Sequence, residues 1–472
     1  MREFTYRLID DKAVKRKLYI LEALNNGGNI VASKNLADQL DCSTRTIIND
    51  VSQLKNELPK DWEIVSVKTR GYILIKPMGE SILPIINSYL TANVLYKIML
   101  GIFHNRYYTL EKWSQLLYMN KLTLRKHLKD YNKMLNKNRL SIKFRELQLE
   151  GDEINVRYYY AAFFYFTQKF DNQCLAPIEL RKKLSSILER NEVQMDVALL
   201  RSIIFVFINR FQHKHYITKE VKHRPIYNND QLNCVNEIII AIENYYNIKL
   251  SKTEKDALYL YLFLGLTVTR SQGNLIIEYL SKTNKDVYES YLHLIDILLT
   301  EKALPGKLKE KLKVELISYF YKMLITNELH LSISYIFNPV FPSKSILLKH
   351  CKKNKALVSR WNTTYNDKKF TREERRLIAT CATSILNSNI QNINILFLFN
   401  GLDVEKNIIY TKLKQSLGEN VKIHKIVSYD IKYDFIISNY QLVDTKAPVF
   451  YISEMLTENE INSVKNRIFN LD

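Results

Sequence analysis

A dense run of positive charge, almost free of acidic residues, lies between Lys121 and Arg145. Nine basic residues occupy these 25 positions, at 121, 125, 126, 129, 133, 137, 139, 143 and 145, against one acid, Asp130. Ammonium and guanidinium groups spaced this closely bind phosphate oxygens and displace the counterions condensed on a nucleic acid. A run of this kind is also a common solvated helix face, so its meaning depends on the elements that carry it.

The elements around this run are those of a helix-turn-helix followed by a hairpin. Residues 93–103 have the apolar spacing of a helix, residues 110–119 that of a short helix, and residues 121–137 that of a longer one. Residues 140–156 predict a β-hairpin that turns near Glu146. The basic run therefore falls on a recognition helix and its wing, which predicts contact with double-stranded DNA. In this unit we predict contacts from Lys121, Thr123, Arg125, Lys126 and Lys129.

An earlier stretch, residues 1–76, repeats this order and predicts a first winged helix-turn-helix. Its first helix is expected to stop at Gly27-Gly28, Ser33 to cap a short second helix, and Asp41-Cys42 to form the turn. Its charges nearly balance, with 13 basic and 10 acidic residues. DNA binding is therefore expected to depend more on the second unit than on the first.

The third helix of this first unit begins STRTIIND, with Ser43 or Thr44 as its cap. A hairpin turning at residues 69–71 forms the wing. Arginine can read guanine and asparagine adenine in the major groove, while wing residues meet phosphate. The side chains predicted to contact DNA here are Thr44, Arg45, Thr46, Asn49, Lys68 and Arg70.

Composition narrows the class of protein further. A formal charge of +20 favours a polyanionic partner, although the Lys-rich composition of an AT-rich genome would raise it too. Five scattered cysteines without a CxxC pair indicate neither a disulfide framework nor a zinc site. The N-terminus lacks the apolar stretch of a secretory signal, and the aromatic run at 158–166 is too short to span a membrane. We expect a cytoplasmic chain without metal, cofactor or membrane partner.

The remainder of the chain has two characters. Residues 158–389 show almost unbroken helical periodicity in two similar halves, SKTEKDALYLYLFLGLTVTR in one matching KFTREERRLIATCATSILNS in the other. The last 80 or so residues alternate strands and helices, beginning with the apolar strand INILFLF, and predict a small α/β sandwich.

The order of these parts resembles the Mga/AtxA/MafR group of virulence-type transcription regulators over essentially the whole chain. The resemblance rests on STRTIINDVSQLKNELPKDWEI with its RGY wing, on LEGDEINVR at 149–157, and on the NPV segment at 338–340. It implies a homodimer, two phosphotransferase-system regulation domains, an enzyme IIB-like tail, and control by the phosphocarrier protein of that system through histidine phosphorylation.

The predicted fold class is thus a mainly α multidomain protein with a small C-terminal α/β sandwich. The limits we predict are 1–80 and 85–160 for the two winged helix-turn-helix units, 168–282 and 283–389 for the two all-helical regulation domains, and 391–472 for the tail.

The sequence departs from the family pattern where phosphate would be carried. The histidine expected after the acidic helix cap is absent from both regulation domains. The remaining candidates for phosphorylation are His213 and His215, with His223 nearby. The tail reads Asn400-Gly401-Leu402-Asp403 where a phosphocysteine is expected, so we predict that it carries no phosphate there.

Two other classes of function compete with a DNA-binding regulator. An enzyme is not indicated, because the sequence has no P-loop, no GxSxG, no HExxH and no GxGxxG after a strand. An RNA-binding antiterminator with paired regulation domains is the main alternative, but such proteins begin with a small β-rich module rather than helix-turn-helices.

Overall fold

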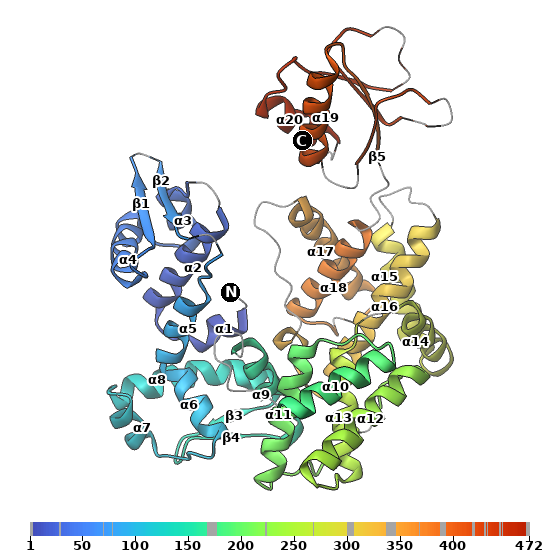
Figure 1. The fold of residues 1–472 in the computed structure, drawn as a ribbon. Coiled ribbons are helices and arrows are strands. Elements are labelled where there is room, and N and C mark those ends of the chain that lie inside the picture. The colour runs from blue at the N-terminus through green and yellow to red at the C-terminus, as the bar shows by residue number, and fades with distance from the viewer. Residues whose placement is uncertain are drawn as a thin grey trace. The chain divides into compact units, whose positions relative to one another are not determined.

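The structure is a computed structural model of the chain (Figure 1). It describes residues 3–27, 30–68, 70–77, 79–167, 177–221, 224–267, 269–299, 306–336, 346–367, 369–387, 393–417, 421–428, 431, 433–442, 445 and 447–468. Two compact bodies divide the chain. The first comprises Met1–Glu289, Ile317–Val340 and Thr371–Leu377, and the second Ser290–Leu316, Phe341–Phe370 and Ile378–Asp472.

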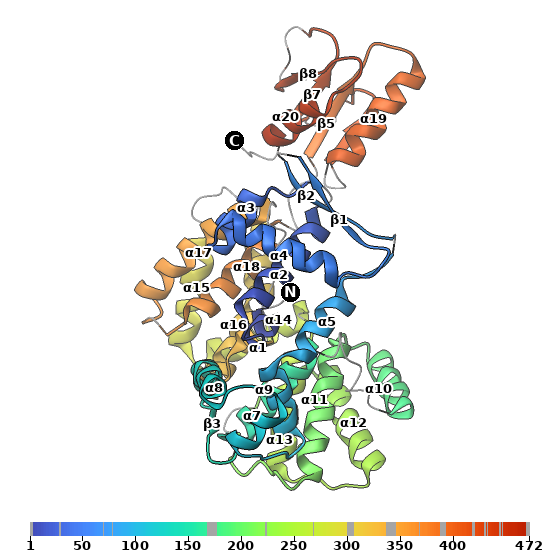
Figure 2. The ribbon, with the colours of Figure 1, turned by 90° about the vertical axis from the view of Figure 1, so that its left-hand side faces the viewer.

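The first winged unit has the predicted order of elements, preceded by one short helix, α1 (Glu3–Leu8), that the sequence did not predict. The predicted elements are α2 (Lys12–Gly27), α3 (Ser33–Leu40), α4 (Thr44–Glu57), β1 (Glu63–Val67) and β2 (Gly71–Ile75). Ile20, Leu36 and Ile47 lie with Val51 and Leu54 in one buried cluster, which holds the three helices together. The antiparallel hairpin of β1 and β2 extends from them as the wing (Figures 1 and 2). The predicted winged helix-turn-helix is confirmed.

Two details of this unit explain its sequence. The predicted cap at Ser33 is wrong: α3 begins at Ser33 itself, and Ala32 precedes it without a side-chain hydrogen bond to the helix. Gly71 opens β2 at a φ of +130°, and a Cβ there would lie 2.1 Å from the carbonyl oxygen of Val31. Only glycine allows this approach, which lets Val31 and Tyr72 exchange two backbone hydrogen bonds and hold the wing to the segment before α3.

The second winged unit repeats the plan of four α-helices and a hairpin, with a 3-10 turn added before the hairpin. Its elements are α5 (Leu83–Ala92), α6 (Val94–Phe103), α7 (Leu110–Leu116), α8 (Lys121–Leu135), the 3-10 turn η1 (Asn136–Asn138), β3 (Ser141–Lys143) and β4 (Gln148–Glu150). The hairpin ends earlier than predicted, because Glu153 begins α9 (Glu153–Thr167). Most residues of α9 are tyrosine, phenylalanine or other apolar types, and nearly all of the helix is buried. This helix leads out of the winged unit into the helical body.

The helical body contains nine further described α-helices. They are α10 (Ile178–Arg190), α11 (Val197–Gln212), α12 (Asn229–Tyr246), α13 (Lys252–Gly265), α14 (Arg270–Thr283), α15 (Lys285–Leu299), α16 (Gly306–Glu328), α17 (Ile346–Thr364) and α18 (Arg372–Asn387). Ser251 caps α13 and Thr371 caps α18, as the two matched segments predicted. The NPV segment at 338–340 lies outside the described residues.

The compact bodies divide the helical region differently from the predicted regulation domains. Residues within 283–389 contribute to both bodies. One reason is that Lys322 of α16 donates hydrogen bonds to the carbonyl oxygens of Leu264 and Leu266, at 3.1 and 2.7 Å. Residues 85 and 160 likewise fall inside α5 and α9. The domain limits therefore stay predictions.

The C-terminal segment forms the small parallel sheet that its apolar strands predicted. The strands β5 (Ile393–Leu398), β6 (Val421–His424), β7 (Phe435–Ser438) and β8 (Val449–Tyr451) are parallel in the order β6-β5-β7-β8. Helices α19 (Asp403–Leu417) and α20 (Glu458–Ile468) supply Leu413 and Val464 to the same buried cluster as Phe397 and Ile437. Both helices therefore cover one face of the sheet.

Candidate nucleic-acid interface

The first recognition helix, α4, is fixed at its start by a side-chain cap. Ser43 accepts a hydrogen bond from the backbone N–H of Thr46 at 3.1 Å, and Asp41 makes the turn at a φ of +49°. Thr44, Arg45 and Asn49 are exposed, as predicted, whereas Thr46 is half-buried. The hydroxyl of Thr46 also lies 2.9 Å from that of Ser43, so this residue supports the cap more than it faces solvent.

The second recognition helix, α8, is built in the same way. Asn120 caps it by accepting from the N–H groups of Leu122 and Thr123, and Tyr118 makes the turn at a φ of +50°. All five predicted DNA-contacting residues on α8 are exposed. Lys121 is paired with Glu111 of α7, so its charge is partly neutralised. Arg125, Lys126 and Lys129 therefore make up most of the positive charge at the start of this helix.

Alignment of the two helix caps defines which positions are equivalent. Counted from Ser43 and Asn120, Thr46 corresponds to Thr123, and Asn49 corresponds to Lys126. Arg45 does not correspond to Arg125: its equivalent is Leu122, and the equivalent of Arg125 is Ile48. The sequence prediction missed these two aliphatic residues, and aligning the helices by their caps would have found them.

One side of α8 faces a cleft of about 1140 Å³ shared with the start of α2 and the junction of α5 and α6. Thr123 and Lys126 line this cleft. His127 closes part of it, since its Nδ1 lies 2.7 Å from a carboxylate oxygen of Asp10, which also accepts from the side-chain amide of Asn93 at 2.6 Å. These contacts fix the orientation of α8 within the first body.

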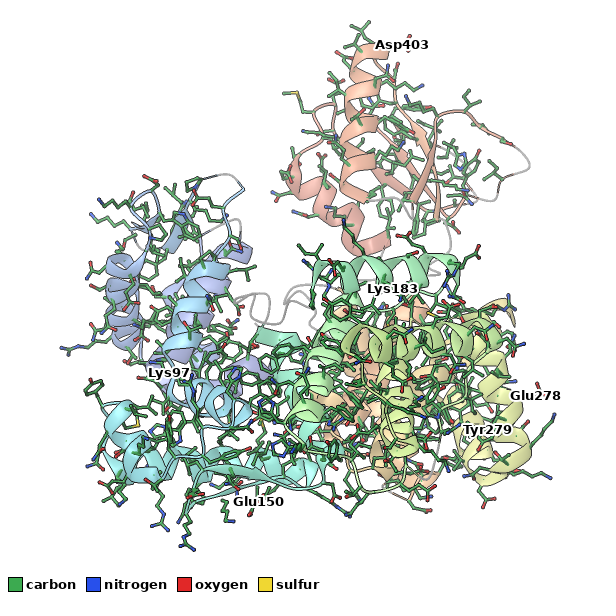
Figure 3. All side chains as sticks on the ribbon, turned by 60° about the horizontal axis from the view of Figure 1, so that its bottom comes forward. Lys97, Glu150, Lys183, Glu278, Tyr279 and Asp403 are labelled. Carbon is green, nitrogen blue, oxygen red and sulfur yellow. The ribbon has the colours of Figure 1, made fainter. Side chains whose placement is uncertain are left out.

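The wings carry the remaining predicted contacts. Lys68 and Arg70 are both exposed on the first wing. On the second wing Lys143 is 3.6 Å from Glu150, the last residue of β4, and Arg145 is exposed in the turn. Lys97 of α6 and Glu150 mark this unit in Figure 3. Positive side chains thus extend from α8 along the hairpin.

A buried ionic network joins the second winged unit to the helical body. Arg157 of α9 donates to both carboxylate oxygens of Glu254 on α13, at 2.6 and 3.1 Å, and both side chains are 1% exposed. Glu153 pairs with Arg157 and, at 2.7 and 2.8 Å, with Arg210 of α11. Glu153 and Arg157 are the acid and the base of the LEGDEINVR motif, so that motif builds a joint between domains.

The two candidate histidines lie beside this joint and differ in their surroundings. His213 is exposed, with Nδ1 2.8 Å from the carbonyl oxygen of Asn209. A carbonyl only accepts, so Nδ1 carries the hydrogen, and in the neutral ring Nε2 is the nitrogen with the lone pair. His215 is half-buried, and its Nε2 lies 3.3 Å from Asn105 Oδ1 of the second winged unit. Burial lowers the pKa of His215, and the Arg210 guanidinium lowers it further. His223 lies outside the described residues.

The loop after β5, where the resemblance implied a phosphocysteine, is held by amide groups. The backbone N–H of Asn400 donates to the side chain of Asn439 at 2.7 Å, and Asn439 donates back to the carbonyl of Asn400 at 2.8 Å. The N–H of Leu402 donates to Glu405. Asp403, labelled in Figure 3, begins α19 immediately afterwards.

The described residues also bear on two other kinds of site. That part of the chain contains no group of three or more His, Cys, Asp or Glu side chains placed to hold a metal ion. It also contains no single helix long and apolar enough to cross a membrane. Helices α5 and α6 reach that length only together, and they meet at an angle of 74°.

The fold of these two units defines a class, a regulator with tandem helix-turn-helix domains, and comparison with known proteins agrees. Residues 79–164 match the Mga helix-turn-helix domain, and residues 16–73 match a general helix-turn-helix domain. The chain is thus similar to transcription regulators of the Mga/AtxA type, most specifically in its second helix-turn-helix unit. Members of this kind are regulators and not enzymes.

Three relatives illustrate this similarity. The capsule synthesis positive regulator AcpB of Bacillus anthracis is 23% identical over 65% of this chain and 64% of its own length. The anthrax toxin expression trans-acting positive regulator of the same organism is 21% identical over 96% of this chain and 98% of its own length. A putative trans-acting regulator of Streptococcus pneumoniae is 21% identical over 51% of this chain and 50% of its own length. The chain thus spans slightly less than two thirds of AcpB but nearly all of the toxin regulator.

Proposed function

We propose that this transcription regulator binds double-stranded DNA directly, reading its sequence or shape, and that its activity follows the state of the sugar phosphotransferase system. The observation that carries the proposal is the exposed basic face of α8, formed by Arg125, Lys126 and Lys129. This face begins at a capped recognition helix within the Mga helix-turn-helix match. Helices of this kind enter the major groove with their first turns against the bases.

Genome-wide DNA occupancy in the native host tests this function. We expect discrete bound sites near the regulated genes, and their occupancy should change when a phosphotransferase sugar is supplied. Occupancy that stays at background under every growth condition would contradict direct DNA binding. Discrete occupancy that ignores the sugar would contradict only the coupling to the phosphotransferase system.

Control by phosphate is expected to act through His213. His213 is exposed, and in its neutral form the Nε2 lone pair can attack the phosphorus of a phosphohistidine on the phosphocarrier protein, breaking its P–N bond as the new one forms. Lys214, the next residue in the sequence, and Arg106, in the loop between α6 and α7, are both exposed. Their positive charges would stabilise the negative charge of a transferred phosphate. Phosphate at this point would lie next to the buried joint with the second winged unit.

Purified enzyme I, phosphocarrier and phosphoenolpyruvate should therefore label the full chain weakly. His213→Ala should remove the label, His215→Ala should retain most of it, and the double change should abolish it. Label that survives the double change would reject this site. Complete absence of label from the unaltered chain would reject phosphotransferase control of the regulator.

We further propose that the regulator is a homodimer and that its C-terminal domain contributes to the interface. Carboxyl ends of parallel strands lie at one edge of a sheet, and the loops and helix α19 near that edge expose large apolar side chains. These are Leu402 at 71%, Val404 at 69%, Ile408 at 58%, Ile426 at 81% and Met455 at 81% exposed. An exposed apolar surface of this density is typical of a binding site for protein.

Val404→Glu with Ile408→Glu should therefore weaken self-association of the full chain by at least about tenfold, because each change buries an unpaired charge in the interface. Ile240→Glu on α12, which is also exposed, should leave self-association unchanged. Sedimentation equilibrium measures the dimer dissociation constant. Equal constants for the double variant and the unaltered chain would exclude this face.

A further inference from the structure

The two recognition helices each expose one large aliphatic side chain in their first two turns, the part of such a helix that meets the bases. Leu122, the second residue of α8, is 74% exposed, and Ile48, the fifth residue of α4, is 52% exposed. A single exposed aliphatic residue is ordinary on a protein surface. Here the feature recurs in both units, in the first two turns of the helix that enters the groove.

Each aliphatic residue has an arginine as its neighbour on the same helix face. Leu122 precedes Arg125 by three residues, and Arg45 precedes Ile48 by three. Residues three apart lie side by side on a helix, so each face presents one guanidinium and one branched aliphatic group. The order of the pair is reversed between the two helices. Both helices therefore present a guanidinium and an aliphatic group at the same two positions, but with the two groups exchanged.

Charge indicates which partner these faces fit. Leu122 is followed on the exposed face of α8 by Arg125, Lys126 and Lys129. An apolar protein partner would have to desolvate this positive charge without compensation. The major groove of DNA, in contrast, combines phosphates, guanine acceptors and one apolar group, the C5-methyl of thymine.

We propose that Leu122 and Ile48 contact thymine C5-methyl groups in the major groove, while Arg125 and Arg45 contact guanine or phosphate beside them. The inference rests on the proposed DNA binding and names the feature of DNA that it reads. Leu122 and Ile48 are then specificity-determining residues. The preferred DNA sites contain a thymine where each of the two recognition helices of one chain contacts the bases. The sequence alone had pointed only to polar side chains as the residues that read bases.

Uracil tests this contact directly, because it pairs as thymine does and lacks only the methyl group. The probes are two 30-base-pair DNA duplexes, one of alternating adenine and thymine and one in which every thymine is replaced by uracil on the same deoxyribose backbone. The full chain should bind the thymine duplex about tenfold more tightly, since each buried methyl group is expected to contribute about three- to fivefold. Fluorescence anisotropy at fixed salt gives both dissociation constants.

The variants separate this contact from general effects on folding. Leu122→Ala with Ile48→Ala should bring the ratio of the two dissociation constants close to one, by weakening binding to the thymine duplex alone. Arg125→Ala should weaken both duplexes and preserve the ratio. Ile178→Ala on α10, which removes a similarly exposed aliphatic side chain, should change neither constant.

Four results would overturn the inference. A ratio near one for the unaltered chain would show that the methyl group is not contacted. In the double variant, two unchanged dissociation constants would assign the methyl contact to other residues. Equal weakening on both duplexes would point instead to a role of Leu122 and Ile48 in the fold. A chain that binds neither duplex nor any other double-stranded DNA would overturn the proposed function and this inference together.

Discussion

Replacing Arg125 and Lys126 by alanine is expected to weaken binding to double-stranded DNA by at least about thirtyfold at ~0.15 M salt. A lost base contact costs about 1–3 kcal/mol, and a lost phosphate contact reduces the slope of log K against log salt by about one unit. Both side chains are exposed at the start of α8, so neither is needed to fill the core. The loss should therefore come from the interface and not from unfolding.

The matched control removes two positive charges elsewhere. Lys182 and Lys183 are exposed on α10, where Lys183 projects from the helical body (Figure 3). Lys182→Ala with Lys183→Ala changes the net charge equally and should leave both the affinity and the salt slope nearly unchanged. Equal losses in the two double variants would mean that net charge alone drives binding, and the assignment of α8 would fail.

Glu254→Gln is expected to destabilise the folded chain strongly. It leaves the Arg157 guanidinium, 1% exposed, without its principal carboxylate partner. Removing one member of a buried ion pair typically costs about 3–5 kcal/mol, because the remaining charge is desolvated and uncompensated. Backbone amides of α9 and α13 should lose protection from hydrogen exchange by roughly a hundredfold or more.

An exposed ion pair provides the comparison. Arg190 and Glu237 pair at the surface, with side chains 66% and 36% exposed. Glu237→Gln should alter exchange by no more than about twofold, since surface pairs contribute little. If Glu254→Gln were equally mild, the network of Glu153, Arg157, Arg210 and Glu254 would not be the joint between the winged unit and the helical body.

This joint places the helical body and the second winged unit in direct contact. The main chain at His215 accepts from Arg157 at 2.6 Å, and Glu254 also accepts from the N–H of Ile217. A second connection runs from Asn138, just beyond α8, whose side chain accepts from the N–H of Ser332 at 2.6 Å. A charge added near residue 213 would therefore act on contacts that end on the second winged unit.

Local chemistry explains why so much of the fold was predictable. Both recognition helices begin at side-chain caps, and the wing glycine is required by its φ and by the carbonyl of Val31. The continuous apolar strand beginning at Ile393 correctly predicted a parallel sheet. These features depend on neighbouring residues, so periodicity and capping rules detect them.

The features that escaped prediction depend on contacts between distant segments. Arg157 pairs with Glu254, which is 97 residues away in the sequence. Asp10 of the first winged unit pairs with His127 of the second. The hairpin was extended too far because LEGDEINV alternates like a strand until Glu153 starts a helix. Leu122 and Ile48 were passed over because an aliphatic residue in a helix pattern suggests a core position, and only exposure distinguishes the two.

The most direct test of the central claim is a competition experiment with the purified full chain. A labelled duplex recovered from an occupied genomic site is bound at ~0.15 M salt, and double-stranded DNA or RNA of the same sequence is added in excess. Direct DNA binding predicts displacement by the DNA at concentrations at least about a hundredfold lower than by the RNA, because the deep, narrow major groove of A-form RNA does not admit a recognition helix. Equal or stronger displacement by RNA would contradict it and favour an antiterminator-like regulator.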